Sequence, residues 1–151
     1  MASAASRTTY LQPARQANSK SEMHTEESIL TEMRRLGFVL TPLANVGYHF
    51  EYCGHDLFLC PDHKQDNVMK IVRPISTDID IKDNIIINNL INETNNVMPL
   101  TTATIVDEDT IWVSYSTYLF GSEPLGVLLR IAVNAVTSTA EHLMGRLKRL
   151  L

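Results

Sequence analysis

The 151-residue sequence predicts an α+β fold, in which helices pack on an antiparallel β-sheet. Three segments carry apolar residues at the helical period, and the segments between them alternate apolar with polar residues as half-buried strands do. The strand segments are grouped in hairpins, so the predicted order is α-β-β-β-α-β-β-α with a long C-terminal helix. Since 44% of the residues are hydrophobic, the chain can bury one ordinary core, which favours a single domain.

The first 24 residues predict a disordered polar tail, because they are rich in Ala, Ser, Thr and Gln and contain no long apolar run. Their Arg- and Ser-rich, acid-poor composition is also typical of an organelle transit peptide, although the segment has no strong apolar moment. The folded domain is expected to span residues 25–151.

The first helix is predicted over residues 26–36. Thr25 is a suitable N-cap residue, and the two glutamates after it lie at the positive end of the helix dipole. Gly37 and Phe38 have the pattern of a left-handed C-terminal cap with its hydrophobic contact. The apolar positions at helical spacing are Ile29, Leu30, Met33 and Leu36.

Residues 46–60 predict a hairpin, since alternating aromatic and polar residues are followed by a turn sequence and a second apolar run. With Gly54 and His55 as the two-residue turn, Cys60 is expected opposite His49. A third strand follows in the segment VMKIVRP and is expected to stop at Pro74, because proline cannot donate to a β-ladder.

The asparagine-rich segment INNLINETNN belongs to a second helix, predicted to begin near Asp80 or Asp83 and to end before Pro99. Its asparagines fall on one arc and form the polar face of an amphipathic helix. Ile81 and Ile85 lie among them, so we expect part of this face to be covered, either by the same chain or by a partner. The predicted apolar arc comprises Ile86, Ile87, Leu90, Ile91, Thr94, Val97 and Met98.

A second hairpin is predicted around the acidic turn at residues 107–109, with the face that carries Ile111 and Val113 toward the core. The last helix is expected to start at Ser122 as N-cap and to reach the chain end, so it is about 40 Å long at about 1.5 Å per residue. That length exceeds what a domain of this size needs to cover its own sheet. Its main apolar stripe comprises Leu125, Leu128, Leu129, Ala132, Val133, Val136, Ala140, Leu143, Met144, Leu147 and Leu150.

A second apolar stripe on the same helix consists of Val127, Ile131 and Ala135, which recur every four residues away from the main stripe. Two interpretations stay open. Isolated exposed apolar residues are common on ordinary surfaces, and a helix with two apolar faces commonly contacts two things. In the second interpretation the stripe is a dimer or partner surface.

The composition argues against several classes of partner and location. The chain has 13 basic and 17 acidic residues, a formal charge of -4, so its net charge does not attract nucleic acid. It has no apolar run of about 18 to 20 residues that would cross a membrane, and its N-terminus lacks the apolar segment of a secretory signal. Because only two cysteines are present, a reducing cytoplasm is the expected location.

Cys53, His55, Cys60 and His63 are the residues that a metal or cysteine site would use. Their spacing is not a standard zinc pattern, and the predicted hairpin places the two sulfurs more than about 10 Å apart at about 3.3 Å per residue. The chain also lacks a glycine-rich phosphate loop and a G-x-S-x-G motif. No catalytic, metal or cofactor site is therefore predicted, and a small metal-dependent or cysteine-based enzyme is the alternative.

The stretch IINNLINETNNVMPLTTATIVDEDTIWVSYSTYL, followed by the closing amphipathic helix, resembles the type III secretion chaperone-like superfamily, including the YbjN-type domains. The resemblance covers about residues 26 to 150 and lies in the order and pattern of elements. It implies a non-enzymatic protein, often homodimeric, that holds an extended segment of a client protein on apolar patches or edge strands. We therefore expect a chaperone-like or regulatory module that uses the stripe at Val127, Ile131 and Ala135 and the patch at Ile81 and Ile85.

Overall fold

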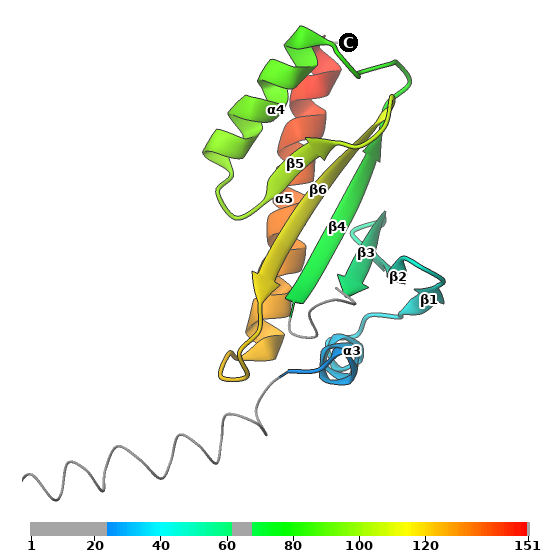
Figure 1. Ribbon diagram of the computed structural model, residues 1–151, viewed down its shortest axis with the longest axis vertical. Coiled ribbons are helices and arrows are strands. Elements are labelled where there is room, and N and C mark those ends of the chain that lie inside the picture. Colours follow the sequence, from blue (N-terminus) through cyan, green and yellow to red (C-terminus); the bar gives the residue numbers. More distant parts are fainter. Residues whose placement is uncertain (1–23, 62–67, 151) are drawn as a thin grey trace, which may run out of the picture.

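The structure is a computed structural model that describes residues 24–61 and 68–150 (Figure 1). The predicted polar tail lies outside these residues except for His24. The α+β class and the predicted order of elements are confirmed, with one additional short strand before the three predicted ones. In chain order the elements are α3 (Glu26–Arg35), β1 (Thr41–Leu43), β2 (Gly47–Tyr52), β3 (His55–Pro61), β4 (Val68–Ser76), α4 (Ile85–Val97), β5 (Thr102–Ile105), β6 (Thr110–Tyr118) and α5 (Leu125–Leu150).

The six strands form one antiparallel sheet with the order β1-β2-β3-β4-β6-β5. Its centre is the β4–β6 pair, which runs from Val68↔Tyr118 to Ser76↔Thr110 and joins the two predicted hairpins. Helix α5 lies along one face of the sheet, against β4 and β6 (Figure 1). Helix α3 packs near the start of α5, and α4 packs near its end. On the opposite face, Trp112 and Tyr118 of β6 are 39% and 53% exposed, so the sheet is open to solvent there.

Helix α3 has the caps that the sequence predicts. The Thr25 hydroxyl accepts a hydrogen bond from the backbone N–H of Ser28, and the Ser28 hydroxyl accepts one from the N–H of Thr25. Gly37 follows the helix with φ of +97°, a left-handed conformation that favours glycine. The Phe38 N–H donates to the carbonyl of Met33, which completes the C-terminal cap.

The predicted turn of the first hairpin is wrong. Tyr52 pairs with His55, so the two-residue turn is Cys53-Gly54, and both residues have positive φ, +52° and +76°, as a type I′ turn requires. Glycine at the second turn position fits this geometry better than glycine at the first. The register shifts as a result: Phe58 lies opposite His49, and Cys60 pairs with Lys70 of β4.

The predicted end of the third strand at Pro74 is also wrong, because β4 continues to Ser76 and Pro74 pairs with Trp112. The last β3–β4 pair is Phe58↔Val72. Beyond it β4 needs ladder hydrogen bonds on one side only, so a residue without an N–H is tolerated at this position.

Helix α4 begins later than predicted, at Ile85, and the Asn84 side chain caps it by accepting hydrogen bonds from two backbone N–H groups. The inward side of the predicted apolar arc is confirmed, but Ile86 and Val97 are 57% and 60% exposed. The arc was predicted too wide, because α4 lies at the margin of the domain and packs mainly against α5 and β5. Its buried residues are Ile87, Leu90, Ile91 and Thr94.

Helix α5 is unbroken over 26 residues and starts at Leu125, so the predicted N-cap at Ser122 is wrong. The Glu123 carboxylate instead accepts hydrogen bonds from the N–H groups of Phe120 and Gly121, at 2.6 and 2.8 Å. Burial by itself raises the pKa of Glu123, but backbone hydrogen bonds, together with the charge of His24, outweigh it and hold the pKa below the usual value. The residues of α5 buried in the core include Leu129, Ala132, Val133, Val136, Ala140, Leu143 and Leu147.

Candidate functional site

The second apolar stripe of α5 lies on the surface. Val127 is 56% and Ile131 is 44% exposed, while Ala135 is half-buried. We call these three residues the outer stripe. The side of the same helix that carries Leu129 and Val133 is buried against the rest of the domain. Because the helix is continuous, the outer stripe presents its two large side chains on one rigid surface.

The second predicted contact surface is not formed as a patch. Ile81 is fully buried, and its N–H donates to the carbonyl of Glu108 at 2.7 Å. It precedes α4 and is covered by the same chain, which was one of the two alternatives that the sequence left open. Ile85 is 73% exposed at the start of α4. Of Ile81 and Ile85, only Ile85 is therefore exposed to a partner.

One asparagine of α4 closes the outer edge of the sheet. The side-chain amide of Asn95 donates from Nδ2 to the carbonyl of Ala103 at 3.0 Å, and its Oδ1 accepts from the N–H of Ala103 at 2.7 Å. Asn95 thus occupies the place of a neighbouring strand at the edge of β5 and blocks strand addition there. The opposite edge is β1, whose three residues are all exposed. From the sequence, Asn95 was expected on a polar helix face, and its role at the sheet edge was not predicted.

The cysteine and histidine cluster predicted as the alternative site does not assemble within the described residues. Cys53 is exposed in its turn and Cys60 is half-buried in β3, and His49 bonds to Asp56 at 2.7 Å. Burial raises the pKa of the Cys60 thiol, and the nearby Lys70 ammonium offsets this only in part. A thiol with a raised pKa is a poor nucleophile at neutral pH. His63 lies outside the described residues.

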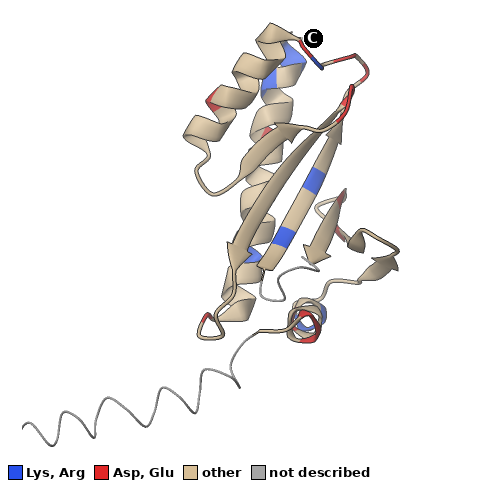
Figure 2. Cartoon of the chain, viewed as in Figure 1, with Lys and Arg blue, Asp and Glu red and all other residues tan. Residues whose placement is uncertain are grey.

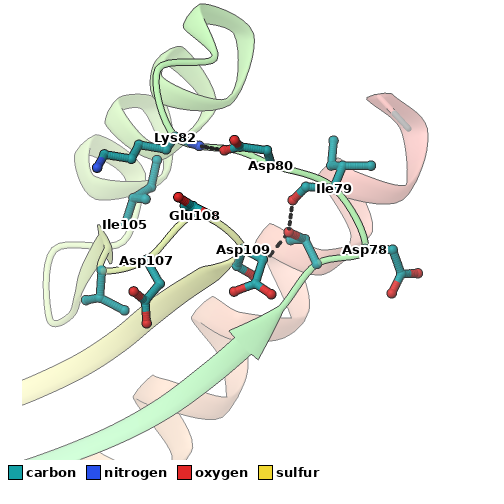
Figure 3. A pocket seen from close by; sticks show the side chains of 10 residues that line it. Asp78, Ile79, Asp80, Lys82, Ile105, Asp107, Glu108 and Asp109 are labelled. Carbon is teal, nitrogen blue, oxygen red and sulfur yellow. Dashed lines mark hydrogen bonds between the residues drawn. The ribbon is translucent and has the colours of Figure 1, made fainter.

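An acidic cavity of about 520 Å³ lies at one end of the sheet, where the segment after β4 faces the turn between β5 and β6 (Figure 3). Figure 2 shows acidic residues gathered at this end of the molecule. Asp80 accepts a hydrogen bond from the N–H of Lys82, and the Thr77 hydroxyl donates to the carbonyls of Ile79 and Asp109. The bond from Thr77 to Asp109 joins the two loops and the other bonds shape the loop after β4, so turn formation accounts for part of the cluster. The carboxylates at the cavity are Asp78, Asp80, Asp107, Glu108 and Asp109.

A second cavity, of about 430 Å³, opens where β3 and β4 separate beyond the Phe58↔Val72 pair. Arg73 lines it and is only 2% exposed, on the same face of β4 as the core residues Ile71 and Ile75. Its Nη2 donates to the sulfur of Met144 at 3.3 Å, and its Nη1 has no partner among the described residues. Burial lowers the pKa of Arg73, and the charge of Glu141 on α5 works in the opposite direction.

Sequence reasoning missed Arg73 as a site residue. The available indication was a charged residue on the core-facing side of a strand, where its neighbours at two-residue spacing, Ile71 and Ile75, are apolar. A buried charge without a partner is costly, so such a position is a candidate for ligand binding.

Among the described residues, no helix is both long enough and apolar enough to span a bilayer.

Comparison with known proteins identifies similar folds. No protein-family model and no curated protein matches the chain. An uncharacterized protein from Methanothermobacter thermautotrophicus is similar with a TM-score of 0.60 and 14% identity, over 82% of this chain and 96% of that one. YbjN from E. coli, a proposed transcription regulator, is similar with a TM-score of 0.60 and 10% identity, over 78% of this chain and 89% of that one. At these identities the likeness shows the fold alone, and the predicted resemblance to YbjN-type domains is confirmed at that level.

Proposed function

We propose that this chain is a non-enzymatic protein-binding module, chaperone-like or regulatory, that acts in the cytoplasm and binds a segment of a partner or client protein. The main support is the outer stripe, whose large side chains Val127 and Ile131 are about half exposed on the side of α5 away from the core. The proposed regulatory role of YbjN, which has the same fold, agrees with such a module.

The energetics define what the outer stripe can contribute. Full burial of a valine or isoleucine side chain contributes about 1.5 to 3 kcal/mol of free energy. Burying the exposed halves of Val127 and Ile131 against a partner would therefore contribute about 1 kcal/mol of binding free energy for each residue. Two such residues are an anchor and not a complete interface. A partner segment that lies along α5 would therefore contact the polar residues beside the stripe as well.

Two observations on the residues that a cysteine-based site would use support a binding function. His49 is bonded to Asp56, and the thiol of Cys60 has a raised pKa. The net charge of -4 gives no general attraction to nucleic acid. Elemental analysis tests the alternative: stoichiometric zinc that disappears in a Cys60→Ser variant would overturn the proposal.

The outer stripe is tested by Ile131→Asp, with Val39→Asp as the matched control. Val39 is 82% exposed in the link between α3 and β1, so its replacement also puts a charge in place of an exposed apolar side chain. Light scattering after size exclusion, at tens of micromolar protein, measures self-association. A homodimer that is lost only in Ile131→Asp would identify a second copy as the stripe's partner.

If the wild-type chain is a monomer, the same variants are used as bait in affinity capture with quantitative mass spectrometry. The proposal expects a defined partner that Val39→Asp retains and Ile131→Asp loses. An oligomeric state and a set of captured proteins that Ile131→Asp leaves unchanged would contradict the use of the outer stripe as a docking surface.

A further inference from the structure

The buried guanidinium of Arg73 lacks the acceptor that its position demands. Five N–H donors belong to this group, yet its Nη1 is unpaired among the described residues and its Nη2 meets only the sulfur of Met144. A thioether sulfur is a weak acceptor, and none of the ion pairs formed by the described residues includes Arg73. A charge that is 98% buried is stable in a folded protein when an anion neutralises it.

The cavity beside Arg73 has room for such an anion together with an apolar body. Its walls come from the start of β3, the end of β4 and Met144 of α5, and its volume is about 430 Å³. Phe58, Pro74 and Ile75 give it apolar lining. Met144 stands where an oxygen acceptor is expected, and its unbranched side chain has three rotatable bonds with which it can move aside.

The charges around the cavity favour a monoanion. Asp56 also lines the cavity, but its carboxylate is held by His49 at 2.7 Å, and Glu141 lies close enough to influence Arg73 without forming an ion pair. The negative charges of Asp56 and Glu141 would repel a dianionic phosphate, with one guanidinium to compensate. A carboxylate carries a single charge and matches the planar fork of arginine in a bidentate pair.

We propose that Arg73 and the cavity between β3 and β4 form a binding site for a carboxylate group with an apolar body, which pairs with the guanidinium and displaces the sulfur of Met144. This site lies beyond the proposed docking function and does not depend on the outer stripe. The carboxylate belongs either to a free small organic acid or to the C-terminus of a peptide.

The test uses the full chain, with sodium hexanoate for the free acid and acetyl-Leu-Leu for the peptide C-terminus. Hexanamide and acetyl-Leu-Leu-amide are the matched neutral controls. Calorimetry and the thermal unfolding midpoint measure binding at up to about 20 mM probe, since a ligand that binds the folded state raises that midpoint. At least one acid is expected to bind, and its amide is not; which acid binds more tightly distinguishes the two sources. Failure of both acids to bind, or equal binding of the amides, would overturn the site.

Arg73→Met removes the charge and keeps much of the side-chain volume, and Arg130→Met makes the same change at an exposed position of α5. Binding of the acid is expected to weaken at least about tenfold in Arg73→Met, because hydrogen bonds to a charged group are lost, and to stay unchanged in Arg130→Met. Without probe, Arg73→Met is expected to be at least as stable as the wild type, since an unpaired buried charge is gone. If Arg73→Met does not fold, Arg73→Lys replaces it in the binding test. Lysine keeps the charge and loses the bidentate fork, so the acid is expected to bind more weakly to Arg73→Lys than to the wild type.

Glu141→Gln separates the site from a purely structural pairing. If Glu141 is the counterion of Arg73 in solution, Glu141→Gln lowers stability and neither acid binds to the wild type, which would refute the site. If the cavity takes a carboxylate, Glu141→Gln binds the acid at least as tightly as the wild type, because a nearby like charge has been removed.

Discussion

Replacing Asn95 with alanine should destabilise the domain by opening the edge of β5. The change removes two hydrogen bonds, at 2.7 and 3.0 Å, and leaves the N–H and the carbonyl of Ala103 without their partner. Each bond contributes about 1 kcal/mol, and alanine regains about 0.6 kcal/mol of helix propensity over asparagine, so a net loss of about 1.5 kcal/mol is expected. Asn92→Ala is the matched control, because Asn92 is exposed one turn earlier on the same helix.

Urea denaturation of the two variants measures this difference. Asn92→Ala should gain about 0.6 kcal/mol from propensity alone, so the two variants should differ by about 2 kcal/mol with the same m-value. Hydrogen exchange gives a local check, since the amide of Ala103 should lose its protection in Asn95→Ala only. Two alanine variants within about 0.5 kcal/mol of each other would refute the proposed role of Asn95, because exposed substitutions already vary by that amount.

Two further predictions concern backbone space and thiol reactivity. Gly47→Ala should destabilise the protein strongly, since Gly47 has φ of +137° and an added Cβ would meet the carbonyl oxygen of Leu59. Gly145→Ala should instead stabilise the protein by about 0.5 to 1 kcal/mol, because Gly145 lies in open space on α5 and alanine is the better helix former. Thermal unfolding of both variants checks this, and a Gly47→Ala as stable as the wild type would contradict it. Alkylation at pH 8 should modify the exposed Cys53 before Cys60, whose raised pKa leaves less thiolate at that pH; mass spectrometry that finds Cys60 modified first would disagree.

Two errors in the sequence-based prediction arose where a choice depended on residues far away in the chain. Pro74 is a local strand breaker, yet it remains in β4 because its partner is Trp112 on β6 and β3 has already diverged. Ile86 belongs to a local apolar arc, yet it is exposed because α4 lies at the margin of the domain. In both cases the local rule is sound, and the neighbours that a strand or helix acquires on folding decide whether it applies.

The candidate surfaces also differ in whether local sequence or distant residues determine them. The outer stripe could be predicted because Val127 and Ile131 repeat at the helical period, and a helix fixes which residues share a face. The sequence left open whether the same chain buries Ile81, because the acidic turn whose Glu108 carbonyl accepts a hydrogen bond from the Ile81 N–H lies more than 20 residues later in the chain. The role of Arg73 required knowledge of where β3 leaves β4 and which residue of α5 lies beneath that gap.

The sequence by itself determined the class of the fold, the caps of α3, the faces of β6 and the inward side of α5, since each depends on residues within a few positions of one another. The tertiary structure decided the pairing of β4 with β6, the closure of the β5 edge by Asn95 and the burial of Arg73 beside a cavity. The physical reason is that local periodicity follows from the geometry of one element, whereas strand order and the solvation of a charge depend on which distant segments share the same space.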